Sequence, residues 1–353
     1  MNPILRLLII YLVFVCYFTI DSICADLFEK KGYKKSHGSM WGLIPVYGLI
    51  RALTIKPLKL VTKTGLRKVY SPLEVLKRTL LMMQLMFVAM VIIIPVIYMV
   101  SSSFANQTDL PTTFFPAKWT LNNYKRLFVE TKFLKWLSNT FLIAVVTMVV
   151  GVVFITGASY VFARFRFKGK KIGLITILVL QVFPTFMTMV AMFALFQTFG
   201  LLGKPLALTI IYIGGAVPFN LWLIKGYLQQ LPKDLDESAM LDGANKLQIF
   251  FKIILPLSVP ILSFVAVSLF MSPWMDYMLP KFLLDVNVSG GAENIKNQWT
   301  LAVGLFEMIS GADKSQYTTF AAGSMVVAIP ITVLYMVFQR FLIQGITAGA
   351  TKG

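Results

Sequence analysis

Seven long apolar stretches, separated by shorter polar ones, run along the chain. Each is close to the roughly 20 residues that a helix needs to cross the hydrocarbon core of a bilayer. They lie at residues 3–22, 80–101, 138–163, 171–198, 206–228, 255–278 and 318–341. A shorter apolar stretch at 41–50 contains Pro45 and is too short to cross, so we expect it at the membrane interface. The pattern predicts an all-α, polytopic membrane protein with one leading helix and a block of six.

The same pattern divides the chain into four segments. We predict a transmembrane anchor at 1–25, a basic cytoplasmic segment at 26–79, a six-span domain at 80–342 and a tail at 343–353. Removal of 1–25 as a signal peptide is the alternative. It would leave the cation-rich second segment outside the cell, so we favour an uncleaved anchor.

The composition excludes an ordinary soluble domain. The chain is 57% hydrophobic and 14% charged, and its mean hydropathy is +0.76. A net charge of +18 is typical of nucleic-acid-binding proteins, but here the cations flank the apolar stretches. The positive-inside rule explains such cations better, so we expect membrane lipid and no nucleic acid as a partner.

The distribution of Lys and Arg predicts the orientation. Segment 26–79 holds 12 of the 33 cations, and the loop 164–171 holds five. With the acidic loop near residue 240 and the tail, 23 cations fall on one side. That side is predicted to be cytoplasmic, which leaves the N-terminus outside.

A compact acidic loop separates two of the predicted spans. Its acids are Asp234, Asp236, Glu237 and Asp242. Pro232 ends the preceding span, and the spacing of Asp234 and Glu237 predicts a capping box at the start of a short helix. Gly243 is predicted to end that helix in the left-handed conformation, and a second helix then leads to Pro256. An ordinary capped connector is the simpler interpretation.

Residues of this loop resemble a known motif. Glu237-Ser238-Ala239, Asp242-Gly243-Ala244, Ile254-Leu255-Pro256 and Pro260 resemble the EAA loop of ABC importer permeases. The family pattern is E-A-A, three residues, a glycine, about nine residues and an apolar-Leu-Pro. The departure is Ser238, where the family prefers an alanine of similar size.

The resemblance implies a coupling role for the loop 232–256. The helix would dock in a groove of a cytoplasmic ATPase subunit and pass its ATP-driven closure to the membrane helices. The residues implied in coupling are Glu237, Ser238, Ala239, Asp242, Gly243, Leu255 and Pro256. Two ABC ATPase subunits would bind ATP and Mg, so this chain needs no cofactor or metal of its own. A sister permease subunit and an extracellular solute-binding protein are the other implied partners.

A wider resemblance covers residues 80–353. Segments 115–128, 163–171, 299–306 and 320–331 are similar to the six-helix permeases of carbohydrate importers, particularly the MalG type of maltose and maltodextrin systems. The expected fold is therefore the MalG/MetI-like permease core, preceded by one extra helix. The ending matches that group at Gly345, Thr347, Gly349, Lys352 and Gly353. In that group the tail reaches into the ATPase dimer interface; a frayed glycine-rich end is the alternative.

Polar and aromatic residues within the spans are candidates for a sugar path. They are Gln181, Asn220, Trp274, Asp276 and Tyr277. Gly214, Gly215 and Pro218 predict an irregular helix of the kind tolerated beside a cavity. The alternatives are contacts between helices for the two amides and an interfacial aromatic belt for Trp274 and Tyr277.

The sequence offers no catalytic constellation. It contains no phosphate-binding loop motif, a single histidine (His37), two cysteines and no pair of acids at mid-span. We therefore expect a non-catalytic protein, and the resemblance implies a subunit that forms half of the translocation path for an oligosaccharide. An ABC permease for another solute and an ion-coupled secondary transporter remain alternatives, and an intramembrane enzyme is disfavoured.

Overall fold

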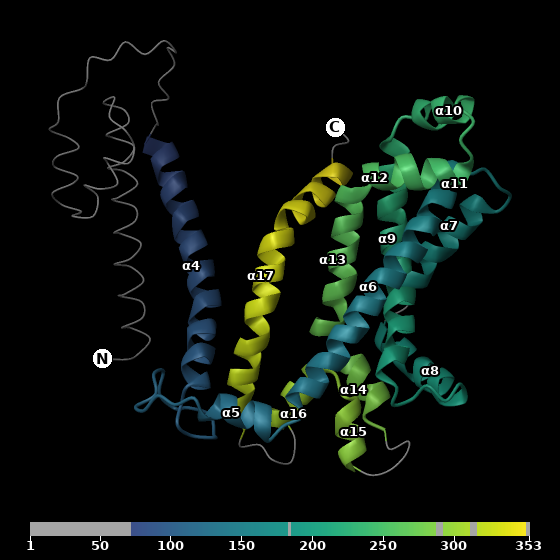
Figure 1. Cartoon of the computed structure of the whole chain (residues 1–353). Coiled ribbons are helices and arrows are strands. Elements are labelled where there is room, and N and C mark those ends of the chain that lie inside the picture. The colour runs from purple at the N-terminus through teal and green to yellow at the C-terminus, as the bar shows by residue number, and fades with distance from the viewer. Residues whose placement is uncertain (1–71, 183–184, 287–291, 311–315, 351–353) are drawn as a thin grey trace. The chain divides into compact units, whose positions relative to one another are not determined.

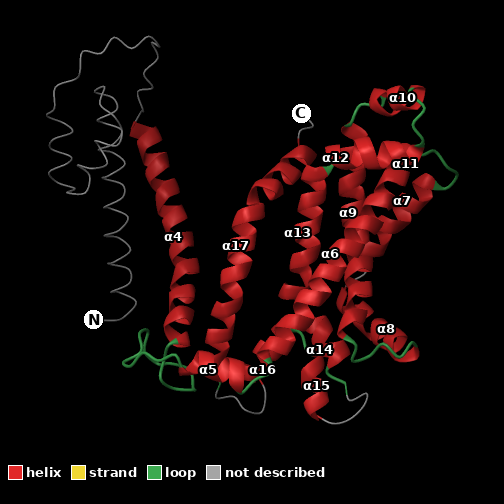
Figure 2. Cartoon of the chain, in the orientation of Figure 1, coloured by secondary structure: helices red, strands yellow, loops and turns green. Residues whose placement is uncertain are grey.

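The computed structural model describes residues 72–350, except 183–184, 287–291 and 311–315. Side chains are also left undescribed at 72–79, 185–186, 292–293 and 340–350. The predicted anchor 1–25, the stretch 41–50, most of the basic segment, and Lys352 and Gly353 therefore lie outside the described residues. The described part of the chain is helical and has no strand, as Figure 2 shows.

The six predicted spans from residue 80 onward all coincide with helices. Within the described residues, four helices are long and apolar enough to cross a membrane: α4 (Pro72–Ser103), α6 (Phe133–Arg164), α9 (Leu208–Gln230) and α17 (Tyr317–Ala350). The other two spans are bent pairs. Helix α7 (Lys170–Val179) with its 3-10 extension meets α8 (Thr185–Thr198) at 105°, and the segment Lys246–Leu257 meets α13 (Val259–Met275) at 79°.

Two compact units make up the chain, and the boundary falls within α4, between Tyr98 and Met99. In the second unit α6 packs along α9 and α13. Ile155, Ile224 and Val265, one from each helix, are fully buried in their shared core. Large apolar side chains cover the outer faces of the long helices, as expected of surfaces that contact lipid or another membrane subunit.

Short helices gather at both ends of the second unit (Figure 1). At one end, called here the α10 end, lie α10 (Asp234–Leu241), α11 (Lys246–Ile249) and α12 (Leu255–Leu257). At the other, the α14 end, lie α5 (Asn122–Val129), α14 (Met278–Leu284), α15 (Ala292–Gln298) and α16 (Leu301–Ser310). The turn from α6 to α7 and the last described residues of α17 lie at the α10 end. The structure thus brings together three segments that the distribution of Lys and Arg predicted to be cytoplasmic. They are the loop 164–171, the acidic loop and the described start of the tail.

The irregular helix expected around Pro218 is not present. Helix α9 continues without a break through Gly214, Gly215 and Pro218. Proline removes one backbone donor, but the other bonds of a membrane helix suffice to keep it continuous. The amide of Asn220 also donates to the carbonyl of Ala216 at 2.9 Å, which adds a bond across the same turn.

Candidate coupling site

Helix α10 ends where the sequence predicts. Gly243 follows it with φ +86°, the left-handed conformation that glycine adopts most easily. The N–H of Gly243 donates to the Met240 carbonyl at 3.1 Å, and that of Ala244 donates to the Ala239 carbonyl at 2.9 Å. These two bonds form a Schellman motif, which closes the helix within one residue. An ideal Cβ at Gly243 would meet nothing within 4 Å, so the position faces open space in this chain.

The predicted capping box at Asp234 and Glu237 is wrong. The N-cap of α10 is Lys233, without a side-chain cap, and both acids lie in the first helical turn, where they interact favourably with the helix dipole. The helix starts one residue too early for Asp234 to cap it. A capping box instead begins α11. Asn245 Oδ1 accepts from the Gln248 N–H at 2.9 Å, and Gln248 Oε1 accepts from the Asn245 N–H at 2.8 Å.

An ion pair between Arg164 and Asp236 links α10 to the C-terminal end of α6. Arg164 Nε lies 3.0 Å from Asp236 Oδ2, and the two side chains are only 7% and 11% exposed. Arg164 Nη2 also donates to the Leu231 carbonyl at 3.1 Å. Asp236 therefore faces a cation of its own chain. Sequence reasoning missed this pair, although the cations at 164–171 and the acids of the loop were its visible signal.

The other predicted coupling residues divide between surface and interior. Glu237, Ser238, Asp242 and Pro256 are exposed, whereas Leu255 is half-buried. Ala239 is 8% exposed because it packs into the core of this chain, so the small side chain permits packing within the chain. Apolar side chains stand out beside the exposed polar ones. They are Leu241, Leu247 and Phe251.

A π-helical turn and a sharp bend connect this site to the membrane helices. The π-helical turn covers Phe250–Ile254, and α12 follows it directly. The chain then turns by 79° at Ser258 into α13. Ser258 is fully buried, and its hydroxyl donates to the Ile254 carbonyl at 2.6 Å. The segment after Gly243 is therefore a short helical arm, set at a steep angle to a membrane helix.

The described part of the predicted tail, residues 343–350, is a continuation of α17. The helix extends to Ala350 and includes Gly345, Thr347 and Gly349, whose side chains are not described. Its last described residues lie at the α10 end of the unit (Figure 1).

Three of the candidate path residues lie together at the end of α13 nearest α14. Asp276 Oδ2 accepts from the Tyr212 hydroxyl at 3.0 Å, and Oδ1 accepts from the Leu279 N–H at 3.3 Å. The ring of Tyr277 packs 4.4 Å from that of Phe306. Trp274 Nε1 is buried and has no hydrogen-bond partner among the described residues. Sequence spacing gave no signal for the contribution of Tyr212.

The other two candidates lie apart from this group in the chain. Asn220 is 6% exposed, and its amide donates within its own helix rather than to a neighbouring one. Gln181 is exposed in the 3-10 turn Leu180–Val182, at the bend between α7 and α8.

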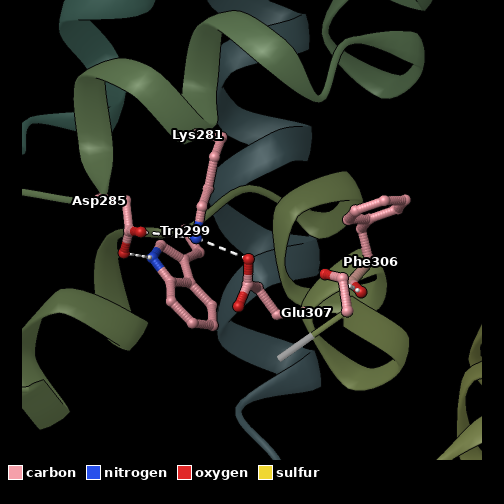
Figure 3. Close-up of polar contacts among 6 residues, drawn as sticks. Lys281, Asp285, Trp299, Phe306 and Glu307 are labelled. Carbon is pink, nitrogen blue, oxygen red and sulfur yellow. Dashed lines mark hydrogen bonds and ion pairs between the residues drawn. The ribbon is translucent and has the colours of Figure 1, made fainter. Parts of the chain in front are cut away.

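A cluster of charged side chains links α14 to α16 (Figure 3). Lys281 Nζ is 2.6 Å from Glu307 Oε1 and also pairs with Asp285. Trp299 Nε1 donates to Asp285 Oδ1 at 3.1 Å. Burial lowers the pKa of Lys281, but hydrogen bonds and attraction from Asp285 and Glu307 outweigh it and raise the pKa above 10.5. The cluster links α14 to α16, in a stretch that hydropathy alone predicted to be loop.

Comparison with known proteins relates these features to a family. The model of the family "Binding-protein-dependent transport system inner membrane component" matches residues 154–348. The maltodextrin transport system permease protein MdxG of Bacillus subtilis (strain 168) is 40% identical over 76% of this chain and 94% of its own. The galactooligosaccharides transport system permease protein GanQ of the same organism is 38% identical, over 76% and 93%.

Two further matches extend the comparison. The trehalose/maltose transport system permease protein MalG of Thermococcus litoralis is 32% identical, over 79% of this chain and 99% of its own. Among solved structures, a chain of a bacterial ABC transporter involved in the import of alginate matches with a TM-score of 0.66 at 24% identity. That match covers 78% of this chain and 99% of the other, and it supports the fold.

Proposed function

The chain belongs to the binding-protein-dependent transport system inner membrane components, as a permease of the carbohydrate ABC importers, and from this premise we propose that it imports a maltodextrin-like oligosaccharide. Members of the family are multi-pass inner-membrane transport components rather than enzymes. They act with an ATPase, a sister permease and a solute-binding protein. We propose two ATPase subunits and one sister permease, so that this chain forms half of the path.

The relatives support the choice of substrate. The 40% identical relative is named for maltodextrin and the 38% identical one for galactooligosaccharides. Both relatives therefore support an oligosaccharide as the substrate class. The first of them supports maltodextrin, a glucose polymer, as the particular oligosaccharide. Nothing in these matches favours a non-sugar solute or an ion-coupled transporter.

The loop 232–256 is proposed to couple the ATPase to the membrane helices. The observation that carries this proposal is the rigid closure of α10 at Gly243 beside exposed Leu241. The buried Arg164–Asp236 pair fixes α10 to α6, and the arm after Gly243 leads into α13 through the bend at Ser258. A movement imposed on α10 would therefore reach two membrane helices directly.

Further residues are assigned by the same proposal. The end of α17 with Gly345, Thr347 and Gly349, continued by Lys352 and Gly353, is proposed to contact the ATPase, since α17 ends at the same end of the unit as α10. Trp274, Asp276 and Tyr277 are proposed to line the sugar path, because they combine hydrogen-bonding groups with aromatic rings. Gln181 and Asn220 are not assigned to the path, because Gln181 lies at the bend between α7 and α8 and the Asn220 amide is bonded within its own helix. The α10 end is proposed to be cytoplasmic.

Reconstitution with the partner subunits tests this function. The isolated chain should hydrolyse no ATP, and the assembled transporter should hydrolyse it faster when binding protein and maltodextrin are present. Labelled maltotriose uptake into proteoliposomes should be inhibited by unlabelled maltodextrins more strongly than by galactooligosaccharides. Equal inhibition by both sugars would overturn the substrate, and ATP hydrolysis by the isolated chain would overturn the division of labour.

A further inference from the structure

A second feature of the α10 end is a cationic pocket beneath α10. It has a volume of about 420 Å³ and lies between the turn from α6 to α7, the end of α9 and the start of α11. Five cations line it, against two carboxylates. The cations are Arg164, Arg166, Lys170, Lys233 and Lys246, and the carboxylates are Asp236 and Glu237.

The charges of this pocket do not balance. Asp236 is neutralised by the buried Arg164. Among the described residues, Arg166, Lys170, Lys233 and Lys246 have no carboxylate within ion-pair distance. Lys170 Nζ donates to the Phe165 carbonyl at 2.9 Å, and Lys246 Nζ contacts the Met240 sulfur at 3.0 Å, a weak acceptor. An excess of positive charge therefore surrounds an open cavity.

The start of α7 adds to this excess. Lys170 is the first residue of the helix, Gly169 precedes it without a side-chain cap, and the first turn contains no acid. Cations at a helix N-terminus oppose the helix dipole, whereas an anion there is favoured by the dipole and by the free backbone N–H groups. The helix start and the cavity thus favour the same kind of ligand.

We propose that this pocket binds a phosphate group beneath the coupling helix. Lysine and arginine from several segments, together with uncapped helix amides, are the groups that proteins use to hold phosphate. The phosphate belongs either to an anionic lipid headgroup, which the surface of the cytoplasmic leaflet supplies, or to a soluble phosphate compound. Such a ligand would join α10, through Lys233, to the starts of α7 and α11. Only the cytoplasmic placement of the pocket rests on the proposed function.

Two binding arms distinguish the sources of phosphate. In the first, the full chain in phosphatidylcholine nanodiscs is titrated with inorganic pyrophosphate by calorimetry. In the second, native mass spectrometry counts phosphatidylglycerol and phosphatidylcholine retained from an equal mixture. Saturable binding in the first arm identifies a soluble phosphate, and selective retention of phosphatidylglycerol identifies a lipid headgroup.

Matched double variants decide whether the pocket is responsible. Lys170→Gln with Lys246→Gln should weaken the binding by about tenfold or more, because each lysine supplies a charge-assisted hydrogen bond. Lys168→Gln with Lys171→Gln removes the same charge from exposed positions outside the pocket lining. This control pair should change the affinity for phosphate less than about twofold. Equal losses of affinity in the two double variants, or no binding in either of the two experiments, would overturn the proposal. Sugar uptake is not measured here, so the proposed coupling function stands or falls separately.

Discussion

Gly304 lies where α16 crosses α6, and a methyl group does not fit there. An ideal Cβ would lie 2.1 Å from Cε3 of Trp136. That ring is 4% exposed, and its Nε1 donates to the Lys296 carbonyl at 2.7 Å, so it has little room to move.

We predict that Gly304→Ala destabilises the α14 end. Overpacking of this kind costs about 1–3 kcal/mol, so the thermal midpoint of the purified chain should fall by several degrees. Gly157→Ala is the control, because its Cβ would meet nothing within 4 Å. Equal midpoints for the two variants would show that Trp136 moves aside freely.

Single residues also show what the sequence could and could not predict. Gly243 was recognisable because a glycine after a short helical pattern is the usual helix end. The Arg164–Asp236 pair was not, because its two members lie 72 positions apart in the sequence and only folding brings them together. The same is true of Tyr212 and Asp276.

At the level of elements, α11 depends on its own cap. The reciprocal bonds of Asn245 and Gln248 satisfy backbone donors at the helix start. We predict that Asn245→Ala costs about 1 kcal/mol locally and raises hydrogen exchange of the amides at 246–248 several-fold. Asp234→Ala should leave those amides unchanged, because Asp234 caps no helix. Faster exchange at 246–248 in the Asp234 variant alone would contradict this assignment.

The cluster around Lys281 should be insensitive to pH across the neutral range. The pKa of Lys281 is raised in the folded state above its ordinary 10.5, despite the opposing effect of burial. Its contribution to stability is therefore fully present below pH 10.5 and is lost as pH rises through the higher folded pKa.

We predict that the difference in thermal midpoint between the unaltered chain and Lys281→Met stays constant from pH 7 to about pH 10, and shrinks above that. Thermal unfolding in a pH series measures this directly. A difference that disappears by pH 9 would mean that the pKa of Lys281 is lowered.

Spans were easier to predict than the shapes of the elements. Hydropathy detects a run of apolar residues whether the helix is straight or bent. It therefore located all six described spans but predicted neither of the two bends. It also missed α14, α15 and α16, because each has ten residues or fewer and no long apolar window. The irregular helix predicted in α9 was wrong, because the single Pro218 does not interrupt a helix that packs against neighbouring helices.

For the whole molecule, the unequal distribution of cations predicts seven spans, with the N-terminus outside and the C-terminus inside. Six of these spans fall in the described residues if each bent pair counts as one. An N-terminal epitope should be accessible on intact spheroplasts, and a C-terminal one only after permeabilisation. Protection of both epitopes in intact spheroplasts would contradict this topology.

The central claim is that α10 transmits the action of an ATPase to the sugar path. The decisive measurement is maltodextrin uptake, with co-purification of the ATPase, by Gly243→Asp in comparison with Gly200→Asp. Both glycines have positive φ and open space at Cβ, so both substitutions cost on the order of 1–2 kcal/mol in this chain. Gly200 follows α8, whereas Gly243 lies on the proposed docking surface. At equal membrane abundance, Gly243→Asp should abolish uptake through lost docking or uncoupled hydrolysis, and Gly200→Asp should retain it. Normal uptake by Gly243→Asp would show that the loop 232–256 is only a connector.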